Sequence, residues 1–149
     1  MVHTTVGSMI EKKGTRVWSI EPDSSVVDAI SVMAREDIGA LVVMRHGKMV
    51  GIISERDYVR KIALAERPPC DFKVRQIMTR DVITVDPEQS VADCMMLMME
   101  RRVRHLPIVD QSNVVGMVSI RDIVTPALSD RGRLIEHFEK FITESVWRS

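Results

Sequence analysis

The chain has 149 residues, enough for one ordinary domain or two very small ones, and its 45% hydrophobic and 28% charged residues are typical of a globular protein. Lys plus Arg and Asp plus Glu both number 21, and this zero net charge argues against a protein that wraps nucleic acid through a basic excess. An aromatic content of 4% is also too low for a surface that stacks single-stranded bases.

The first half of the chain alternates extended segments with amphipathic helices. In chain order, periodicity and turn residues predict a helix over 6–13, an extended segment over 17–20, a helix over 26–36, strands over 41–44 and 49–53, and a helix that begins near Glu55. Ser25 and Ser54 stand directly before the second and third helices, where N-caps belong. Pro68 and Pro69 then interrupt the helical pattern and mark a linker over 66–73.

The second half repeats this pattern at a fixed offset of 65 residues. Of the 40 positions from Ile20 to Val59, 12 are identical to their counterparts at that offset, without any gap. The repeated elements are an extended segment over 82–85, a helix over 91–102 after Ser90, strands over 107–109 and 114–118, and a helix that begins near Ile120. Gly47 and Asn113 are expected to supply the positive backbone angles of the two hairpin turns. We therefore expect two β-α-β-β-α repeats of the α/β (α+β) class, packed about a pseudo-two-fold axis.

The domain organisation that follows has four parts. Residues 1–65 hold the N-terminal helix and the first repeat, 66–73 the linker, 74–128 the second repeat, and 129–149 a C-terminal amphipathic helix. One face of that last helix, over 131–147, carries the apolar residues Leu134, Ile135, Phe138, Phe141, Ile142 and Val146. This stripe must be buried, and we expect the helix either to pack in a dimer or to contact a partner.

The candidate ligand-binding residues lie where the last strand of each repeat meets its last helix. There Ser54 or Ser119 caps the helix, and Arg56–Asp57 or Arg121–Asp122 stands in its first turn. The N–H groups of a helix N-terminus hold anions, Ser and Arg add donors for phosphate, and Asp accepts hydrogen bonds from a ribose diol. Each junction therefore has the groups for half of a nucleotide site. The same residues are also an ordinary capped helix start, and the sequence leaves both interpretations open.

The two repeats resemble a tandem pair of CBS domains, also called a Bateman module. The resemblance covers about residues 9–124 and depends on a motif of a hydrophobic strand, Gly, two hydrophobic residues, Ser and, three residues later, Asp, which is complete at 51–57 and at 116–122. Segments 38–43 and 103–109 match the second hallmark of that family. The Lys-Gly step at Gly14 and the tail over 133–143 are similar to proteins that consist of such a pair alone.

This resemblance implies two clefts between the repeats that bind an adenosine compound: AMP, ADP, ATP, NAD or S-adenosylmethionine. By position, one cleft has Asp122 on ribose, Ser119 and Arg121 near phosphate, and Ser19, Ile38, Gly39, Ala40 and His105 around the base. The other has Asp57 on ribose, Ser54 and Arg56 near phosphate, and Thr84, Val103, Arg104 and His105 around the base. Ile20 and Pro107 complete the set of residues expected to contact ligand. Gly39 and Ala40 correspond to Arg104 and His105, so we expect the two clefts to differ in charge and room.

The resemblance also implies a regulatory module that senses energy or redox state, forms a homodimer and acts on a separate protein partner. The run of Met95, Met96, Met98 and Met99 is expected in the core and at the dimer face. We expect no catalytic residue and no required cofactor, because Asp57 and Asp122 are the only repeated acids and ribose binding explains them. We expect no metal site, because His3, His46 and His137 lie far apart in the sequence. The alternatives are a nucleic-acid-binding protein or a scaffold that only dimerises.

The remaining expectations concern location and thiol chemistry. No apolar run approaches the roughly 18 residues of a membrane span, and residues 1–8 show no secretory signal. Cys70 and Cys94 are too few for a disulfide scaffold. We therefore expect a cytoplasmic protein without a membrane partner, in which Cys94 is inert within an apolar helix and Cys70 is exposed.

Overall fold

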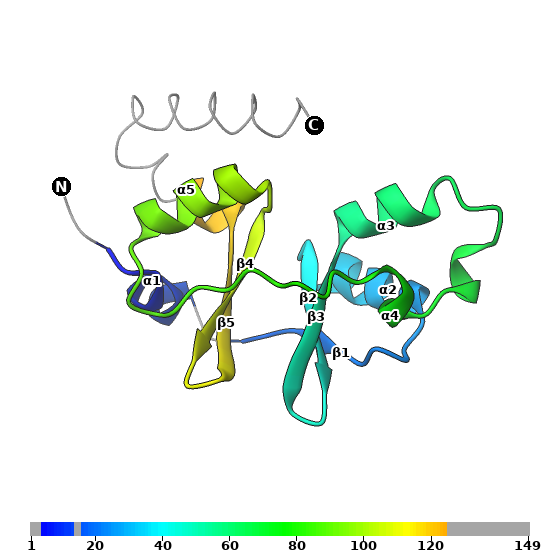
Figure 1. Ribbon diagram of the computed structural model, residues 1–149, viewed down its shortest axis with the longest axis horizontal. Coiled ribbons are helices and arrows are strands. Elements are labelled where there is room, and N and C mark those ends of the chain that lie inside the picture. The colour runs from blue at the N-terminus through cyan, green and yellow to red at the C-terminus, as the bar shows by residue number, and fades with distance from the viewer. Residues whose placement is uncertain (1–3, 14–15, 125–149) are drawn as a thin grey trace. The chain divides into compact units, whose positions relative to one another are not determined.

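The computed structural model describes residues 4–13 and 16–124 (Figure 1). These residues belong to two compact units, one formed by residues 16–82 and the other by residues 4–13 together with 83–124. Each unit has its own strands and its own cluster of buried apolar side chains. The helix expected over 131–147 lies outside the described residues.

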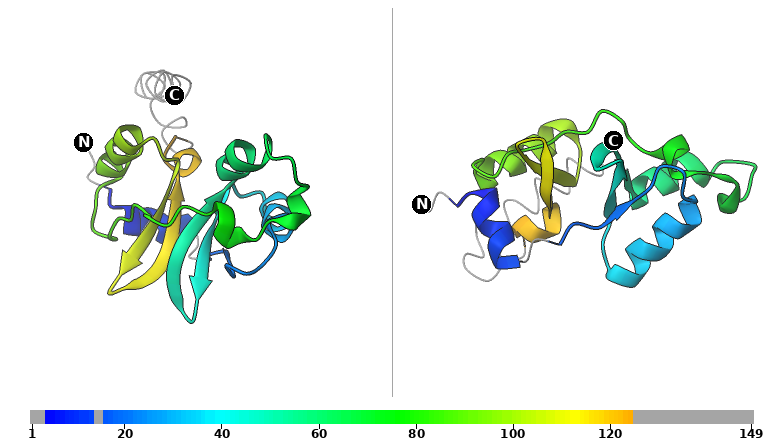
Figure 2. Two further views of the ribbon diagram at one scale, coloured as in Figure 1. Left: turned by 45° about the vertical axis from the view of Figure 1, so that its right-hand side comes forward. Right: turned by 90° about the horizontal axis from the view of Figure 1, so that it is seen from below.

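The unit of residues 16–82 holds the first repeat. Its elements are β1 (Ser19–Ile20), α2 (Val26–Glu36), β2 (Ala40–Arg45), β3 (Lys48–Ser54), α3 (Glu55–Ile62), the 3-10 turn η1 (Pro69–Asp71) and α4 (Val74–Ile77). The strand order is β1-β2-β3, with β1 parallel to β2 and an antiparallel hairpin of β2 and β3. The helices α2, α3 and α4 lie on the same side of this hairpin (Figures 1 and 2) and cover the fully buried Leu41 and Ile53.

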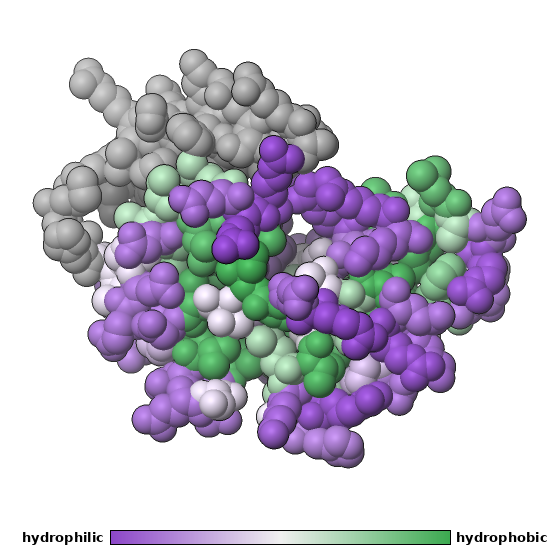
Figure 3. Space-filling model, in the orientation of Figure 1, coloured by the Kyte–Doolittle hydropathy of each residue, from purple (hydrophilic) through white to green (hydrophobic). Residues whose placement is uncertain are grey.

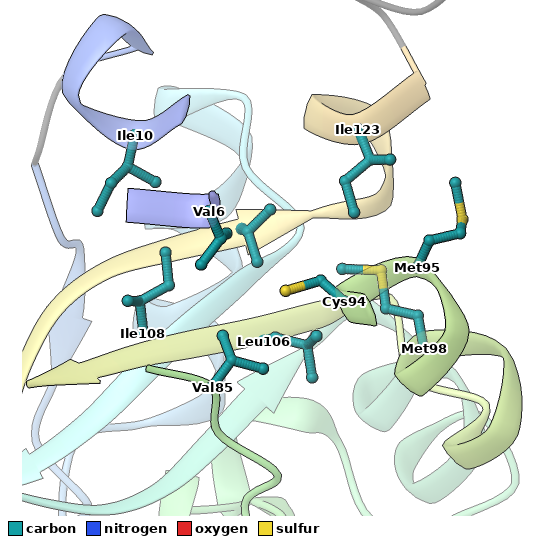
Figure 4. Close-up of a cluster of buried hydrophobic side chains, with 10 residues drawn as sticks. Val6, Ile10, Val85, Cys94, Met95, Met98, Leu106, Ile108 and Ile123 are labelled. Atoms are coloured by element: carbon teal, nitrogen blue, oxygen red, sulfur yellow. The ribbon is translucent and has the colours of Figure 1, made fainter. Parts of the chain in front are cut away.

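The other unit holds the second repeat together with the N-terminal helix. Its elements are α1 (Val6–Lys13), α5 (Val91–Arg101), β4 (His105–Asp110), β5 (Asn113–Ser119) and a helical segment over 120–124. The strands β4 and β5 form an antiparallel hairpin, and Val85 bridges to Ile108 in parallel, as Ile20 of β1 pairs with Val43. Figure 4 shows side chains from α1, α5 and the strands converging on one core, in which Leu106 and Ile108 are fully buried.

The helix starts follow from local sequence in both units. Ser25 Oγ accepts the N–H of Asp28 at 3.0 Å, and Ser90 Oγ accepts the N–H of Asp93 at the same distance. An N-cap hydroxyl of this kind satisfies one of the unpaired N–H groups at the start of a helix. These starts are confirmed as expected, and the bounds of α2 agree with those that the apolar periodicity predicts.

The two hairpin turns correct one prediction. Gly47 has a φ of 75° in the first turn, as expected. Asn113, however, is the first residue of β5 and pairs with Asp110, so it lies outside the second turn. The positive angles there belong to Gln111 and Ser112, with φ values of 50° and 69°. The expected role of Asn113 is wrong because a two-residue turn leaves only the two residues between the paired positions to adopt this conformation.

Each unit is completed by a helix that precedes the other repeat in the chain. The first two N–H groups of α1 donate to the carbonyls of Gln89 and Pro87, at 2.7 and 2.9 Å. The first two N–H groups of α4 donate to the carbonyls of Ser24 and Pro22, at 2.8 and 2.9 Å. Since these acceptors correspond at the offset of 65 residues, the two helices are held in the same way.

This packing differs from the grouping expected along the chain. We expected the N-terminal helix to belong with the first repeat in residues 1–65 and residues 66–73 to be a plain linker. In the structure α1 packs in the unit of the second repeat, and η1 and α4 pack in the unit of the first. Backbone hydrogen bonds to a distant turn place the apolar face of each short helix on its core. Local sequence patterns do not reveal such long-range contacts.

In the part of the chain that the structure describes, exposed large apolar side chains are few and lie on helices or just beyond them. Met95 and Met98 are buried in the core as expected, whereas Met96 of α5 is 52% exposed. Val59 of α3 and Leu64, two residues after that helix, are 61% and 92% exposed. Figure 3 shows apolar surface in that region at the upper right. The core role is confirmed for Met95 and Met98, whereas Met99 is half-buried and Met96 is exposed. The role of the methionine run at a dimer face stays a prediction. None of the helices in the described residues is long and apolar enough to cross a membrane.

Candidate functional site

A reciprocal capping box forms the strand–helix junction of the first repeat. β3 ends at Ser54, whose Oγ accepts the N–H of Asp57 at 3.2 Å. Asp57 Oδ2 in turn accepts the N–H and the hydroxyl of Ser54, at 3.0 and 3.1 Å. The carboxylate is thus held against the start of α3, where the unpaired N–H groups favour a negative charge.

The other oxygen of this carboxylate meets two further side chains. Lys61 Nζ, one helical turn along α3, lies 3.5 Å from Asp57 Oδ1, and Thr79 Oγ1 donates to the same oxygen at 3.4 Å. Lys61 Nζ also donates to the carbonyl of Ile77 at 2.7 Å. The Asp57 side chain is only 15% exposed. This carboxylate is therefore surrounded by donors from three separate segments of its own unit.

Lys61 and Thr79 were missed by the sequence analysis. A signal for Lys61 was present, because Pro126 stands at its place in the second repeat and the two copies therefore differ next to a repeated Asp. No such signal existed for Thr79. It reaches Asp57 because the segment after α4 pairs with β3, where Thr79 and Ile52 exchange both backbone hydrogen bonds, at 2.8 and 3.0 Å.

The junction of the second repeat has the same reciprocal hydrogen bonds. β5 ends at Ser119, whose N–H donates to Asp122 Oδ2 at 2.8 Å, and the N–H of Asp122 donates to Ser119 Oγ at 3.1 Å. Arg121 is exposed here, whereas Arg56 is half-buried in the first repeat. Both copies of the motif are thus capped helix starts, and their predicted role in binding ribose and phosphate stays a prediction.

The starts of β2 and β4 lie beside the junctions of their own repeats. The carbonyls of Gly39 and Arg104 accept the first N–H group after the capping serine, at 3.0 and 2.9 Å. The next residues, Ala40 and His105, lie opposite those serines in the hairpin register. The two segments expected around the base therefore contact the strand–helix junctions, and the second segment has the larger and more basic side chains.

The other residues expected at the ligand are distributed along the strands. Ser19 and Ile20 form β1, Ile38 and Val103 are half-buried before β2 and β4, Thr84 is exposed beside Val85, and Pro107 is buried in β4. The carbonyl of Pro107 accepts the N–H of Val85 at 3.0 Å. The expected grouping of residues from both repeats into shared clefts concerns both units and stays a prediction.

Close packing explains the glycine of the motif. A Cβ atom at Gly51 would lie 2.7 Å from Met78 Sδ and 2.9 Å from the carbonyl oxygen of Thr79. A Cβ atom at Gly116 would lie 2.8 Å from Ile10 Cδ1. Each motif glycine therefore marks the place where the segment completing that unit crosses the last strand.

Within residues 4–13 and 16–124, no group of three His, Cys, Asp or Glu side chains could hold a metal ion.

A model of the CBS domain family matches residues 10–64 and 74–127, one copy in each repeat. The chain belongs to the CBS domain family. Its two CBS domains stand in tandem, and their mixed α/β fold is the class that the sequence predicts. The Ser and the Asp of both junctions, at 54–57 and at 119–122, lie within the matched residues.

Similar proteins support this assignment. The chain is 36% identical to the mitochondrial CBS domain-containing protein CBSX3 of Arabidopsis thaliana, across 93% of this chain and 72% of that protein. The crystal structure of the CBS domain protein NE2398 is 46% identical, with a TM-score of 0.81, and covers 84% of this chain and 98% of that one. The CBS domain pair of MJ0100, crystallised with 5'-methylthioadenosine and S-adenosyl-L-methionine, is 26% identical, with a TM-score of 0.72 over 87% of this chain and all of that one.

Proposed function

We propose that this CBS pair is a non-catalytic regulatory module that binds an adenosine compound and passes the occupancy of its sites to a separate protein partner. The observation that carries the proposal is the complex of the related MJ0100 pair with two adenosyl ligands. AMP, ADP, ATP and NAD share the adenosine of those ligands and are the expected compounds here. Because the levels of these compounds follow the energy and redox state of the cell, the module would sense that state through them.

The two junctions have suitable chemistry for such ligands. The hydroxyl of Ser119 and the N–H groups of the helix starts are the donors expected for a phosphate, and the hydroxyl of Ser54 can join them once it leaves Asp57 Oδ2. The carboxylates of Asp57 and Asp122 are acceptors for the two hydroxyls of a ribose. A neutral chain with few aromatic side chains is poorly suited to nucleic acid, so we keep nucleotides as the ligand class.

The proposal includes a homodimer, a cytoplasmic location and no membrane partner. The exposed Met96 on α5 supports an association through that helix, because an exposed methionine is an adaptable apolar contact. A dimer without a ligand is the second candidate, since the same helix would serve a scaffold equally well. Sedimentation of the nucleotide-free chain, with Met96→Lys as the disruptive variant, tests this part.

Calorimetric titration of the nucleotide-stripped full chain tests the central claim. AMP, ATP, NAD and S-adenosylmethionine are titrated separately, after mass spectrometry has identified any compound that co-purifies. Saturable binding at one or two sites per chain supports the proposal, and the compound recovered unchanged afterwards supports a non-catalytic role. If none of the four compounds binds, or if the chain retains a labelled oligonucleotide instead, the proposal is contradicted.

A further inference from the structure

Two pairs of donors contact the Asp57 carboxylate. The N–H and the hydroxyl of Ser54 reach Oδ2 at 3.0 and 3.1 Å, whereas Thr79 Oγ1 and Lys61 Nζ reach Oδ1 at 3.4 and 3.5 Å. A carboxylate has about four acceptor positions, so these donors fill it. A ribose hydroxyl that binds here must replace one of them, and the longer contacts on Oδ1 are the weaker pair.

The two donors on Oδ1 also hold the end of α4 and the residues that follow it. Lys61 Nζ donates to the carbonyl of Ile77, the last residue of α4, at 2.7 Å. Thr79, two residues later, exchanges two backbone hydrogen bonds with Ile52 of β3, at 2.8 and 3.0 Å. One carboxylate oxygen is thus connected to the chain on both sides of the buried Met78.

These residues lie where the chain leaves the first unit. Val82 is the last residue of this unit, and the chain continues into the other unit at Ile83. We call residues 77–82 the exit segment. Gly51 allows its close approach to β3, because a Cβ atom there would lie 2.9 Å from the carbonyl oxygen of Thr79. The exit segment therefore joins the carboxylate of the candidate site to the second repeat along the chain.

We propose that Asp57, Thr79 and Lys61 form a latch that transmits nucleotide occupancy of this junction to the exit segment. A ribose hydroxyl that donates to Asp57 Oδ1 displaces Thr79 Oγ1 and Lys61 Nζ, and the exit segment is then held less firmly. Because ligand and latch compete for one oxygen, each weakens the other by the same factor. The inference depends on the proposed function and adds to it the element that passes on the occupancy of this site.

Amide hydrogen exchange of the full chain, followed by NMR with and without AMP, tests the latch. The N–H groups of Thr79 and Ile52 pair the exit segment with β3. They should exchange about 2- to 10-fold faster when AMP is bound, the range expected when one hydrogen bond that holds the segment is lost. The N–H groups of Leu41 and Ile53 in the β2–β3 hairpin are the control and should exchange no faster.

Two matched variants test the hydroxyl of Thr79 without a change of charge. Thr79→Val removes the donor and keeps the backbone pairing, so it should speed exchange at Ile52 in the ligand-free chain. By the same competition it should strengthen AMP binding by about 2- to 10-fold in calorimetry. Thr79→Ser keeps the hydroxyl and should behave like the wild type.

The outcomes separate the latch from the proposed function. AMP that binds but leaves exchange at Thr79 and Ile52 unchanged or slower overturns the latch, and so does Thr79→Val with the AMP affinity of Thr79→Ser. Either result leaves the proposed function standing. If AMP does not bind, the same measurements are made with ATP, NAD and S-adenosylmethionine, which also have a ribose. Binding by none of the four contradicts both the latch and the proposed function.

Discussion

The two units use one framework and fill it with different residues. Leu41 and Leu106 are fully buried at corresponding places, and both hairpins have their irregularity at the same point, after Val43 and after Ile108. The helix facing each hairpin differs, because Cys94 stands in the second core where Ala29 stands in the first. The two units therefore share backbone geometry and helix docking, whereas the side chains around that geometry have diverged enough to give each unit its own chemistry.

The largest predicted difference concerns the two thiols. Burial, with Asp93 and Asp86 nearby, raises the pKa of the Cys94 thiol from 9.0 to about 11. Cys70, just after two prolines in the other unit, is exposed. The thiolate is the reactive form, and a rise of this size lowers its population about 100-fold at neutral pH. We expect Cys70 to be alkylated at least about 100-fold faster than Cys94. Peptide mapping after a timed reaction measures this, and comparable rates would contradict the buried position of Cys94.

The same thiol makes a pH-dependent contribution to stability. Because the folded-state pKa of Cys94 lies above that of an ordinary thiol, the unfolded state loses its proton first as the pH rises. The contribution is fully present below about pH 9, and the free energy of unfolding should fall between about pH 9 and pH 11. Cys94→Ala, which copies Ala29 of the first unit, should reduce that fall in urea titrations. An unchanged pH profile in this variant would show that another group is responsible.

The motif glycines give the next largest difference. Gly51→Ala places a Cβ atom against the carbonyl oxygen of Thr79, which cannot move without shifting the backbone, whereas Gly116→Ala places it against the end of the Ile10 side chain. We expect Gly51→Ala to cost about 2–3 kcal/mol and Gly116→Ala about 1 kcal/mol, the range typical of overpacking. Chemical denaturation measures both values.

Matched double variants separate the two causes. Ile10→Val removes the contacting Cδ1 atom, so the double variant Ile10→Val/Gly116→Ala should lose less stability than the two single variants lose in sum. Met78→Ala removes a side-chain neighbour of Gly51 and leaves the carbonyl of Thr79 in place, so it should not restore stability to Gly51→Ala. Full restoration by Met78→Ala would show that the backbone contact is unimportant.

Such contacts mark the limit of what the sequence alone could predict. The repeat offset and the capping serines predicted α2, both hairpins and both strand–helix junctions, because these depend on local patterns. Local patterns could not predict that α1 packs on the second repeat and α4 on the first. Both helices are short and apolar on one face. Long-range contacts determine where each of them docks, namely backbone hydrogen bonds to a distant turn and close packing beside Gly116 or Gly51. The hydrogen bond from Thr79 to Asp57 was missed for the same reason, since Thr79 belongs to a segment that pairs with β3 only in the folded unit.

The hairpin turns supply a smaller contrast. Ser112 has a φ of 69° where Gly47 has a φ of 75°, and only glycine adopts this region without a steric cost. A Cβ atom at Gly47 would meet nothing within 4 Å, so backbone strain alone distinguishes the two turns. Ser112→Gly should stabilise the chain by up to about 1 kcal/mol, and Gly47→Ser should destabilise it by a similar amount. Thermal melts of both variants measure this, and shifts of the same sign would contradict the assigned turn geometry.

The smallest predicted difference is electrostatic. In the first unit, Asp23 is shared by two guanidinium groups: its Oδ1 lies 2.8 Å from Arg75 Nη1, and its Oδ2 lies 3.1 Å from Arg45 Nη2. In the second repeat, Glu88 and Asp110 stand at the places of Asp23 and Arg45, so two acidic residues replace an ion pair. The first unit therefore has an electrostatic link between its turn, its hairpin and α4 that the second repeat does not copy.

Because the Asp23 side chain is 56% exposed, solvent and salt weaken these ion pairs. Asp23→Ala should lower the free energy of unfolding by only about 0.5–1 kcal/mol in dilute buffer, and the loss should nearly vanish near 1 M salt, where the screening length is about 3 Å. Glu88→Ala is the matched control, with a change within about 0.5 kcal/mol at any salt concentration. A loss from Asp23→Ala that persists at high salt would show that the carboxylate acts by shaping the turn before α2, and the difference between the units would then be conformational and not electrostatic.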